Sequence, residues 1–305
     1  MKRLSVICGL VTLWAIAGSA QDMTKVKPNM TEGVEAMGSF IFTYVDDKKR
    51  RRLTLEMYRP AEITEPRPAI VFYFGGGWQN GRPGLFAPMA QALAQRGYIT
   101  VLPEYRLSGE AEFPAAVNDA KAAVRWTRKN AKRFKIDPDR IACMGGSAGG
   151  HLSGFVAATS ETGGFEGEGE HQDVSSAVQA AVVMCGPMDL LAPDVVEKIE
   201  QSAKGKAAHP AIPFLGGLPS THEEVYRQAS PVTHVSAHTP PMLFIDGEKD
   251  RPRERYTTFW PLLEKHGVPY EFVMMPQAPH PFWNNREWFL PTVEAVEGFL
   301  KKHLP

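Results

Sequence analysis

The sequence has little of what marks a nucleic-acid-binding or a disulfide-rich protein. Its 305 residues include 34 Lys and Arg against 34 Asp and Glu, so no net charge attracts a nucleic acid or an anionic membrane surface over a long range. With 3 cysteines, it has too few for a small disulfide-stabilised scaffold. What it does have is 43% hydrophobic residues, enough for one large core. We therefore expect a globular protein that binds no nucleic acid.

Long apolar runs are missing after the N-terminus, and the one at the N-terminus has the pattern of a secretory signal peptide. Basic residues at 2–3 precede an apolar run at 4–17, and small residues follow at 18–20. This run is shorter than the roughly 20 residues that a membrane-spanning helix needs, which favours cleavage before Gln21 over an uncleaved anchor. We predict a signal peptide at 1–20, one domain at 21–305, no later membrane span, and a secreted or periplasmic protein.

Two cysteines remain in the mature sequence, and both lie in apolar runs. We expect Cys143 and Cys185 to be core thiols. An oxidising compartment permits a disulfide between them, but strand geometry rarely brings two such side chains to bonding distance. Neither has CxxC spacing or a nearby histidine ligand, so the sequence indicates no metal centre.

The rest of the chain alternates between short apolar runs and helical periods, without a linker, a repeat or a low-complexity tract. Residues 39–45 and 52–58 have the two-residue period of a half-exposed antiparallel hairpin. Six further runs are apolar almost throughout, which is typical of parallel strands buried on both faces: 69–74, 98–102, 140–144, 178–185, 242–246 and 270–275. Helical periods such as 85–96 and 115–132 separate them, so we predict an α/β fold with eight strands and helices on both faces. In such a sheet, ligands bind beyond the carboxyl ends of the strands.

A serine stands in a glycine-rich turn directly after the run at 140–144. The letters GGSAG at 145–149 match GxSxG, and a helix-like stretch follows at 152–158. A serine on a sharp turn from strand to helix has a strained backbone and an exposed hydroxyl. The alternative is a glycine-rich turn with a capping serine. The position between strand and helix favours Ser147 as a nucleophile, with the N–H of Ala148 facing a developing oxyanion.

Three glycines and Trp78 follow the run at 69–74. Backbone N–H groups of Gly76 and Gly77 can point into a cavity and stabilise the tetrahedral intermediate of acyl transfer. A triple glycine alone is more often an ordinary loop. Its place ahead of the serine turn favours an oxyanion hole formed by Gly76, Gly77 and Ala148.

From about residue 40 to its end, the chain resembles the α/β-hydrolase fold, and more narrowly the GGG-loop carboxylesterases akin to hormone-sensitive lipase and the bacterial carbohydrate esterases. The matching motifs are GGGW at 75–78, YRL at 105–107, FPAA at 113–116, Asp119, Trp126, GGSAGGH at 145–151 and SP at 230–231. The resemblance implies an α/β-hydrolase catalytic domain with an eight-stranded, mostly parallel sheet and an N-terminal antiparallel hairpin. The family usually has a histidine before the glycines, where this chain has Phe74, so the support of the glycine loop must differ.

The resemblance also implies the partners of Ser147, since in this fold the triad follows the order Ser, acid, His. Asp250 takes the acid position, because 246–250 resembles the family's HGxxD with Asp246 in place of the histidine. Asp246 and Glu248 remain alternative acids. His280 lies where the family has its general base, one loop beyond the last apolar run. A carboxylate that accepts the imidazole N–H would orient this base.

Features around these residues constrain the substrate. Trp78 and Trp283 lie near the expected catalytic edge and could stack on sugar rings, although core or rim packing is an equally good explanation. The segment before the hairpin is too short for a helical N-terminal cap, so we expect an open site. The glycine- and glutamate-rich loop at 163–170 is expected to be a mobile acidic rim.

These observations predict a secreted serine esterase that removes acetyl or another small acyl group from an acylated polysaccharide or oligosaccharide. Ser147 would attack the ester, His280 would take its proton, and water would hydrolyse the acyl-enzyme without a cofactor or a metal. A general carboxylesterase or lipase acting on aliphatic esters is the main alternative. A serine peptidase or amidase and a catalytically silent binding module are the others.

Overall fold

The computed structural model describes residues 25–26, 32–45, 48, 50–162, 164–205, 207–250 and 254–304. The predicted signal peptide at 1–20 lies outside the described residues. So does most of the predicted turn between the first two strands. Within the described part of the chain, none of the helices combines the length and the apolar character that crossing a bilayer requires.

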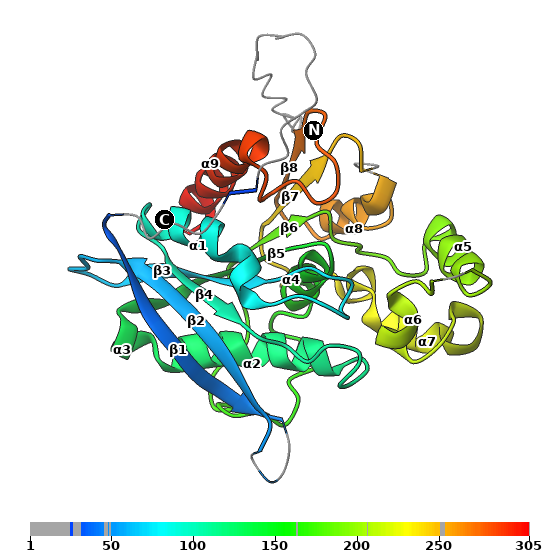
Figure 1. The fold of residues 1–305 in the computed structure, drawn as a ribbon, viewed down its shortest axis with the longest axis horizontal. Coiled ribbons are helices and arrows are strands. Elements are labelled where there is room, and N and C mark those ends of the chain that lie inside the picture. The colour runs from blue at the N-terminus through cyan, green and yellow to red at the C-terminus, as the bar shows by residue number, and fades with distance from the viewer. Residues whose placement is uncertain are drawn as a thin grey trace.

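Eight strands form a single twisted sheet (Figure 1). They are β1 (Val34–Tyr44), β2 (Arg52–Pro60), β3 (Arg67–Tyr73), β4 (Ile99–Pro103), β5 (Ile136–Gly146), β6 (Ala180–Met184), β7 (Met242–Gly247) and β8 (Tyr270–Met275). Their spatial order is β1-β2-β4-β3-β5-β6-β7-β8. β1 and β2 pair antiparallel, β2 pairs antiparallel with β4, and the six strands from β3 to β8 are parallel to one another. The predicted α/β fold with an antiparallel hairpin and six parallel strands is confirmed.

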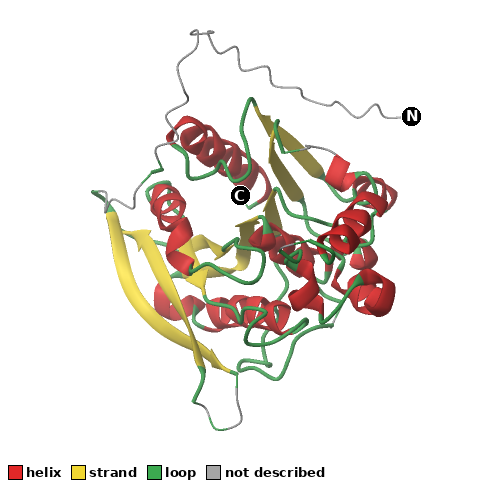
Figure 2. Cartoon of the chain, turned by 45° about the vertical axis from the view of Figure 1, so that its right-hand side comes forward, coloured by secondary structure: helices red, strands yellow, loops and turns green. Residues whose placement is uncertain are grey.

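Helices cover the sheet on both sides (Figure 2). The α-helices are α1 (Ala87–Ala94), α2 (Ala115–Lys129), α3 (Ala131–Phe134), α4 (Ala148–Ala158), α5 (Pro193–Ser202), α6 (Ala211–Leu215), α7 (Pro219–Ala229), α8 (Trp260–Lys265) and α9 (Arg286–His303), and short 3-10 helices are η1 (Pro83–Phe86), η2 (Pro231–His234) and η3 (Glu254–Tyr256). α1 contacts α9, and α2 contacts α3 and α4, so two helical layers enclose the sheet.

The burial of each strand explains its apolar pattern. Every residue of β4, β6 and β7 is buried, as the continuous apolar runs predict. β1, at one edge of the sheet, is buried only at Val34, Phe42 and Thr43. Because the parallel strands end at the same edge, the loops after β3, β5, β7 and β8 lie close together in space, and these loops carry the predicted site.

Three helices between β6 and β7 form an insertion, α5 to α7, that lies against the loop after β3. A Cβ atom on Gly77 would lie 2.8 Å from Cβ of Pro210, which precedes α6. The ring of Phe214, in α6, stacks on Trp78 with centroids 4.6 Å apart and planes 4° apart. The insertion therefore supports the glycine loop from outside the sheet.

Candidate active site

Ser147 lies at the turn between β5 and α4 and has a backbone conformation that few side chains adopt. Its φ is 57° and its ψ is −121°. A non-glycine residue in this region is strained, and the surrounding contacts must hold it there. They include a hydrogen bond from its N–H to the carbonyl of Met184 at 2.8 Å, and one from the N–H of His151 to its own carbonyl at 3.0 Å. The predicted strained turn is present.

Glycines on both sides of Ser147 are required by the close approach of α4 to the strands. A Cβ atom on Gly149 would lie 1.9 Å from the carbonyl oxygen of Tyr73. A Cβ atom on Gly145 would lie 2.2 Å from the carbonyl oxygen of Gly149. Any larger residue at these two positions would therefore push the helix away from the sheet and move the serine.

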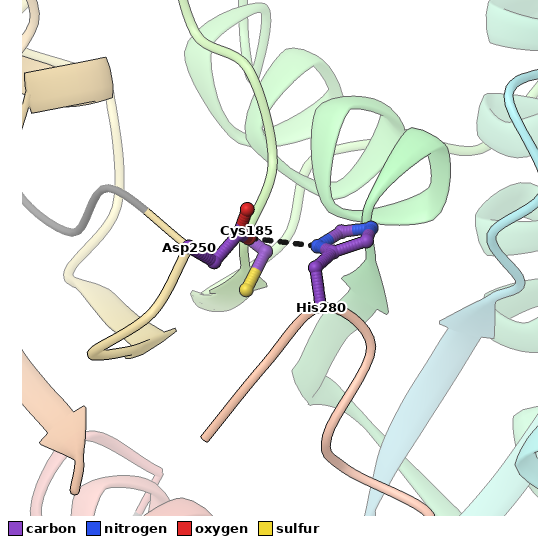
Figure 3. A group of neighbouring side chains, drawn as sticks. All are labelled: Cys185, Asp250 and His280. Carbon is purple, nitrogen blue, oxygen red and sulfur yellow. Dashed lines mark hydrogen bonds and ion pairs between the residues drawn. The ribbon is translucent and has the colours of Figure 1, made fainter. Parts of the chain in front are cut away.

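The structure joins the three predicted catalytic side chains by hydrogen bonds in the order Ser147, His280, Asp250, and we call these three residues the row. The Nδ1 atom of His280 lies 2.8 Å from Oδ2 of Asp250 (Figure 3). Its Nε2 atom lies 3.1 Å from Oγ of Ser147. The side chains of His280 and Asp250 are 34% and 22% exposed, so a substrate in solvent can reach the row. With Nδ1–H donated to Asp250, the lone pair of Nε2 faces the serine hydroxyl, as a general base requires.

Of the three candidate acids, only Asp250 contacts His280. Asp246 has no exposed surface, and its Oδ1 accepts hydrogen bonds from the hydroxyl of Tyr256 at 2.8 Å and from a backbone N–H at 2.9 Å. Glu248 accepts hydrogen bonds from the backbone and side chain of Gln277. Neither alternative acid therefore lies against the imidazole.

Arg255 connects Asp246 to Asp250, and the sequence analysis did not identify it. Its Nε lies 3.1 Å from Oδ2 of Asp246, and its Nη2 lies 2.8 Å from Oδ2 of Asp250. Its Nη1 donates to the carbonyl of Cys185 at 2.9 Å. We call Asp246, Arg255 and Asp250 the acid-side group. A cation five residues after the acid was the only sequence signal for it.

The contacts of Asp250 keep its carboxylate ionised. Burial raises the pKa of Asp250, but the hydrogen bond from His280 and the positive charge of Arg255 outweigh it, so the pKa lies below its ordinary value. An ionised carboxylate in this position is what a histidine acting as a general base needs to stabilise its imidazolium.

The glycine loop lies beside the serine. A Cβ atom on Gly75 would lie 3.2 Å from Cβ of Ser147. The carbonyl of Gly76 accepts hydrogen bonds from the two residues that close the turn, Gln79 and Asn80. The N–H groups of Gly76, Gly77 and Ala148 donate to no acceptor among the described residues. They are free to bind an oxyanion, and the oxyanion hole itself stays a prediction.

Phe74 replaces the usual histidine, and aromatic packing supports the loop in its place. Its ring stacks on Tyr105 with centroids 4.1 Å apart, and the hydroxyl of Tyr105 donates to the carbonyl of Phe74 at 2.8 Å. A Cβ atom on Gly81 would lie 2.6 Å from the Phe74 ring. The ring therefore fills the base of the loop.

The structure corrects the prediction that Trp78 and Trp283 bind substrate. Trp78 is 4% exposed, because Phe214 covers one face and its indole N–H donates to Nδ1 of His151 at 3.3 Å. Trp283 is 5% exposed, and its ring would contact a Cβ atom on Gly146 at 2.5 Å. Both rings pack beneath the site, so neither presents a face to a sugar.

His151 is a structural residue, as expected. It is fully buried, and its Nε2 lies 2.8 Å from the carbonyl oxygen of Ala229. Since Nδ1 accepts from Trp78, Nε2 carries the proton and the ring is neutral. Burial lowers the pKa of His151 to about 4, despite the hydrogen bond to Ala229.

The loop expected to be a mobile acidic rim is held by ion pairs to two buried cations. Lys121 and Arg125, which are 0% and 1% exposed in α2, both bond to the carboxylate of Glu166, with Nζ of Lys121 at 2.7 Å. The hydroxyl of Ser176 donates to the same carboxylate. We call Lys121, Arg125 and Glu166 the loop group. Burial raises the pKa of Glu166, but the two cations and these hydrogen bonds outweigh burial, so the pKa lies below its ordinary value.

A cavity of about 350 Å³ lies next to the glycine loop. It is lined in part by Arg51, Phe74, Gly81, Glu104, Tyr105 and Glu110. Among its lining residues, Nε of Arg51 bonds Glu110 at 2.7 Å. Phe74 and Gly81 flank the glycine loop, so the cavity adjoins that loop, but neither Ser147 nor His280 lines it.

Comparison with known proteins agrees with this geometry. The family described as BD-FAE matches residues 55–253, and the family described as prolyl oligopeptidase family matches residues 209–305. The chain is similar to the probable carboxylic ester hydrolase LipM of Mycobacterium tuberculosis, with 34% identity over 62% of this chain and 42% of the relative. It is 31% identical to esterase LipC of the same organism over 64% of this chain and 48% of the relative. The chain thus spans about half the length of these curated relatives.

Solved structures are similar over most of this chain. Esterase Est2 of Thermogutta terrifontis with butyrate bound has a TM-score of 0.71 and 30% identity, and covers 89% of this chain and 94% of its own. The same esterase phosphorylated by paraoxon has a TM-score of 0.69 and 30% identity, over 90% of this chain and 95% of its own. A truncated carbohydrate esterase from gut microbiota shares the fold, with a TM-score of 0.72 and 23% identity over 94% of this chain and 99% of its own.

Proposed function

The chain belongs to the BD-FAE family and has the α/β-hydrolase fold, and from this we propose that it is a serine carboxylic ester hydrolase. The observation that carries the proposal is the row from Ser147 through His280 to Asp250, with the serine strained at its turn. A row of this kind activates a hydroxyl that would otherwise be a weak nucleophile.

The positions of Ser147, His280 and the free N–H groups suit the two stages of ester hydrolysis, acylation of the serine and hydrolysis of the acyl-enzyme. His280 takes the hydroxyl proton while Ser147 attacks the ester carbonyl, and the carbonyl oxygen becomes an oxyanion. The free N–H groups of Gly76, Gly77 and Ala148 stabilise that charge. His280 then gives its proton to the leaving alcohol. Water, deprotonated by His280 in turn, hydrolyses the acyl-enzyme and restores the serine.

We further propose that the acyl group is small and the alcohol polar, as in an acylated polysaccharide. Est2, a solved relative at 30–31% identity, was crystallised with butyrate and with propionate, both short acyl groups. The cavity beside the glycine loop carries Arg51, Glu104 and Glu110, which suit a hydrophilic alcohol better than a hydrocarbon chain. The N-terminal pattern at 1–20 supports export to where polysaccharides are found.

A general carboxylesterase that acts on aliphatic esters is the second candidate, because similar proteins carry that name. Carboxylesterase NlhH of Mycobacterium tuberculosis is 39% identical over 106 residues. Rates on acetylated xylan, nitrophenyl acetate and nitrophenyl esters of longer acids distinguish the two. The polysaccharide proposal requires a higher kcat/KM on acetylated xylan and a fall with acyl length.

Reaction with paraoxon tests the esterase proposal itself. The full chain is incubated with the organophosphate, and the adduct is located by peptide mass spectrometry. We expect one adduct, on Ser147, with loss of ester hydrolysis in proportion to labelling. The variant Ser147→Ala should fold and take up no label. An adduct on another serine, or none, would contradict the proposal.

A further inference from the structure

Cys185 lies beside the catalytic histidine and aspartate, and the mechanism does not use its sulfur. The Sγ of Cys185, a carboxylate oxygen of Asp250 and a ring nitrogen of His280 all lie within 4.8 Å of one another. Figure 3 shows the three side chains converging from three segments of the chain. They follow β6, β7 and β8, so no spacing in the sequence links them.

The backbone of Cys185 fixes the direction of its side chain. Its φ is 51°, an uncommon value for a residue with a Cβ atom. Its N–H donates to Oδ1 of Asp246 at 2.9 Å, and its carbonyl accepts from Arg255 at 2.9 Å. The residue is held on both sides, and Cys185 is not in a disulfide.

The thiol of Cys185, the imidazole of His280 and the carboxylate of Asp250 supply sulfur, nitrogen and oxygen, the donor atoms that bind zinc in proteins. Zinc and cadmium bind thiolate, imidazole and carboxylate together, with bonds of about 2.0–2.3 Å for zinc. Three protein ligands leave a fourth position for water. The three donor atoms already lie within 4.8 Å of one another. Small rotations of the side chains would place all three at bonding distance from one cation between them.

Resting on the proposed esterase function, we propose that a thiophilic divalent cation binds Cys185, Asp250 and His280 and reversibly inhibits the enzyme. The cation forms bonds to Sγ of Cys185, to Nδ1 of His280 and to a carboxylate oxygen of Asp250. The thiol loses its proton to solvent, and the imidazole proton moves from Nδ1 to Nε2. One proton is released in all, and no electron is transferred.

Inhibition follows from the position of the imidazole proton. In the free enzyme, the lone pair of Nε2 faces Oγ of Ser147 at 3.1 Å. With the cation on Nδ1, Nε2 carries the proton and can no longer accept one from the serine. The nucleophile stays in place, but its base is lost.

Arg255 makes the site selective for soft cations. Its Nη2 lies 2.8 Å from Oδ2 of Asp250 and opposes a second positive charge there. Only a cation that gains from the sulfur should overcome this repulsion, because hard cations such as magnesium prefer oxygen ligands. The cation would enter from the side of His280, since Cys185 itself is 1% exposed.

A cadmium titration of the full chain tests the proposal. Two quantities are followed, the rate of ester hydrolysis and the thiolate-to-cadmium absorption band in the ultraviolet. We expect cadmium to lower the rate as the band appears, EDTA to restore the rate, and magnesium to have no effect. In Cys185→Ser, the cadmium concentration that halves the rate, relative to its own metal-free rate, should rise about tenfold or more.

Cys143→Ser is the matched control, because it removes the other buried cysteine, which lies next to Ser153. It should keep both the sensitivity and the band. Equal sensitivity of Cys185→Ser and the unmodified chain, or inhibition without the band, would overturn the metal site. An enzyme with no ester hydrolysis before cadmium is added would instead contradict the proposed function, and the band would still report on binding.

Discussion

The acid-side group and the loop group both pair buried charged side chains with partly exposed partners, yet they do different things. In the acid-side group, one carboxylate oxygen, Oδ2 of Asp250, is shared between Arg255 and the catalytic His280. In the loop group, Glu166 is bonded by Lys121, Arg125 and a serine hydroxyl. The ion pair of Arg255 and Asp250 contacts His280 and so can affect turnover. The ion pairs of Glu166 contact none of the proposed catalytic residues and so stabilise only the fold.

Breaking the loop group should give the largest change in stability. Glu166→Gln leaves Lys121 and Arg125 buried without a carboxylate, which we expect to lower the free energy of unfolding by about 3–5 kcal/mol. The kcat of the folded protein should be unchanged. Urea denaturation and steady-state kinetics measure the two effects. Glu168→Gln is the control, because Glu168 is exposed in the same loop and should change neither. A fall in kcat with Glu166→Gln would abolish the distinction between the groups.

His151 sharpens the comparison, because it is a buried titratable side chain without a charged partner. Its pKa is lowered from 6.5 to about 4 in the folded protein, so the unfolded chain binds a proton at a higher pH than the folded one. Stability should therefore fall between pH 6.5 and pH 4, by about 3 kcal/mol from this residue.

His151→Gln keeps a donor for Ala229 and an acceptor for Trp78 and cannot titrate. We expect its free energy of unfolding to depend less steeply on pH over that window, although it is less stable at pH 7. Denaturation at several pH values for both proteins provides the difference. Parallel curves would show that His151 is charged in the folded state.

A conservative change in the acid-side group should give the smallest effect, confined to turnover. Lys at position 255 cannot contact Asp246, Asp250 and a backbone carbonyl at once. We expect Arg255→Lys to lower kcat about tenfold with little change in KM. Arg128→Lys is the control, since among the described residues Arg128 bonds backbone carbonyls and a glutamine and none of Ser147, His280 and Asp250. An unaltered kcat in Arg255→Lys would show that the role of Asp250 does not depend on the contacts made by Arg255.

The sequence predicts the strands and the nucleophile because both depend on local signals, and it predicts the acid and the base because the chain resembles a family whose triad order is known. Six apolar runs correspond to β3 to β8, and each catalytic residue lies one loop beyond such a run. Ser147 is recognised by the glycines around it. These positions must be glycine because α4 packs too closely on the strands for a Cβ atom to fit.

What the sequence could not predict depends on where side chains point across loops. Trp78 is buried because Phe214, far along the chain, covers it. Glu166 pairs with two cations of α2, and neither the composition of its loop nor its glycines indicate this. Arg255 and Cys185 meet the catalytic residues only once β6 and β7 are paired.

The most direct test of the account is a kinetic cycle on Ser147 and His280. Steady-state rates are measured for Ser147→Ala, His280→Ala and the double variant, with circular dichroism as the check on folding. Because the two residues act as one unit, each single change should lower kcat by several orders of magnitude, and the double variant should be no slower than the singles. Losses that multiply in the double variant, or a near-normal rate in His280→Ala, would contradict the account.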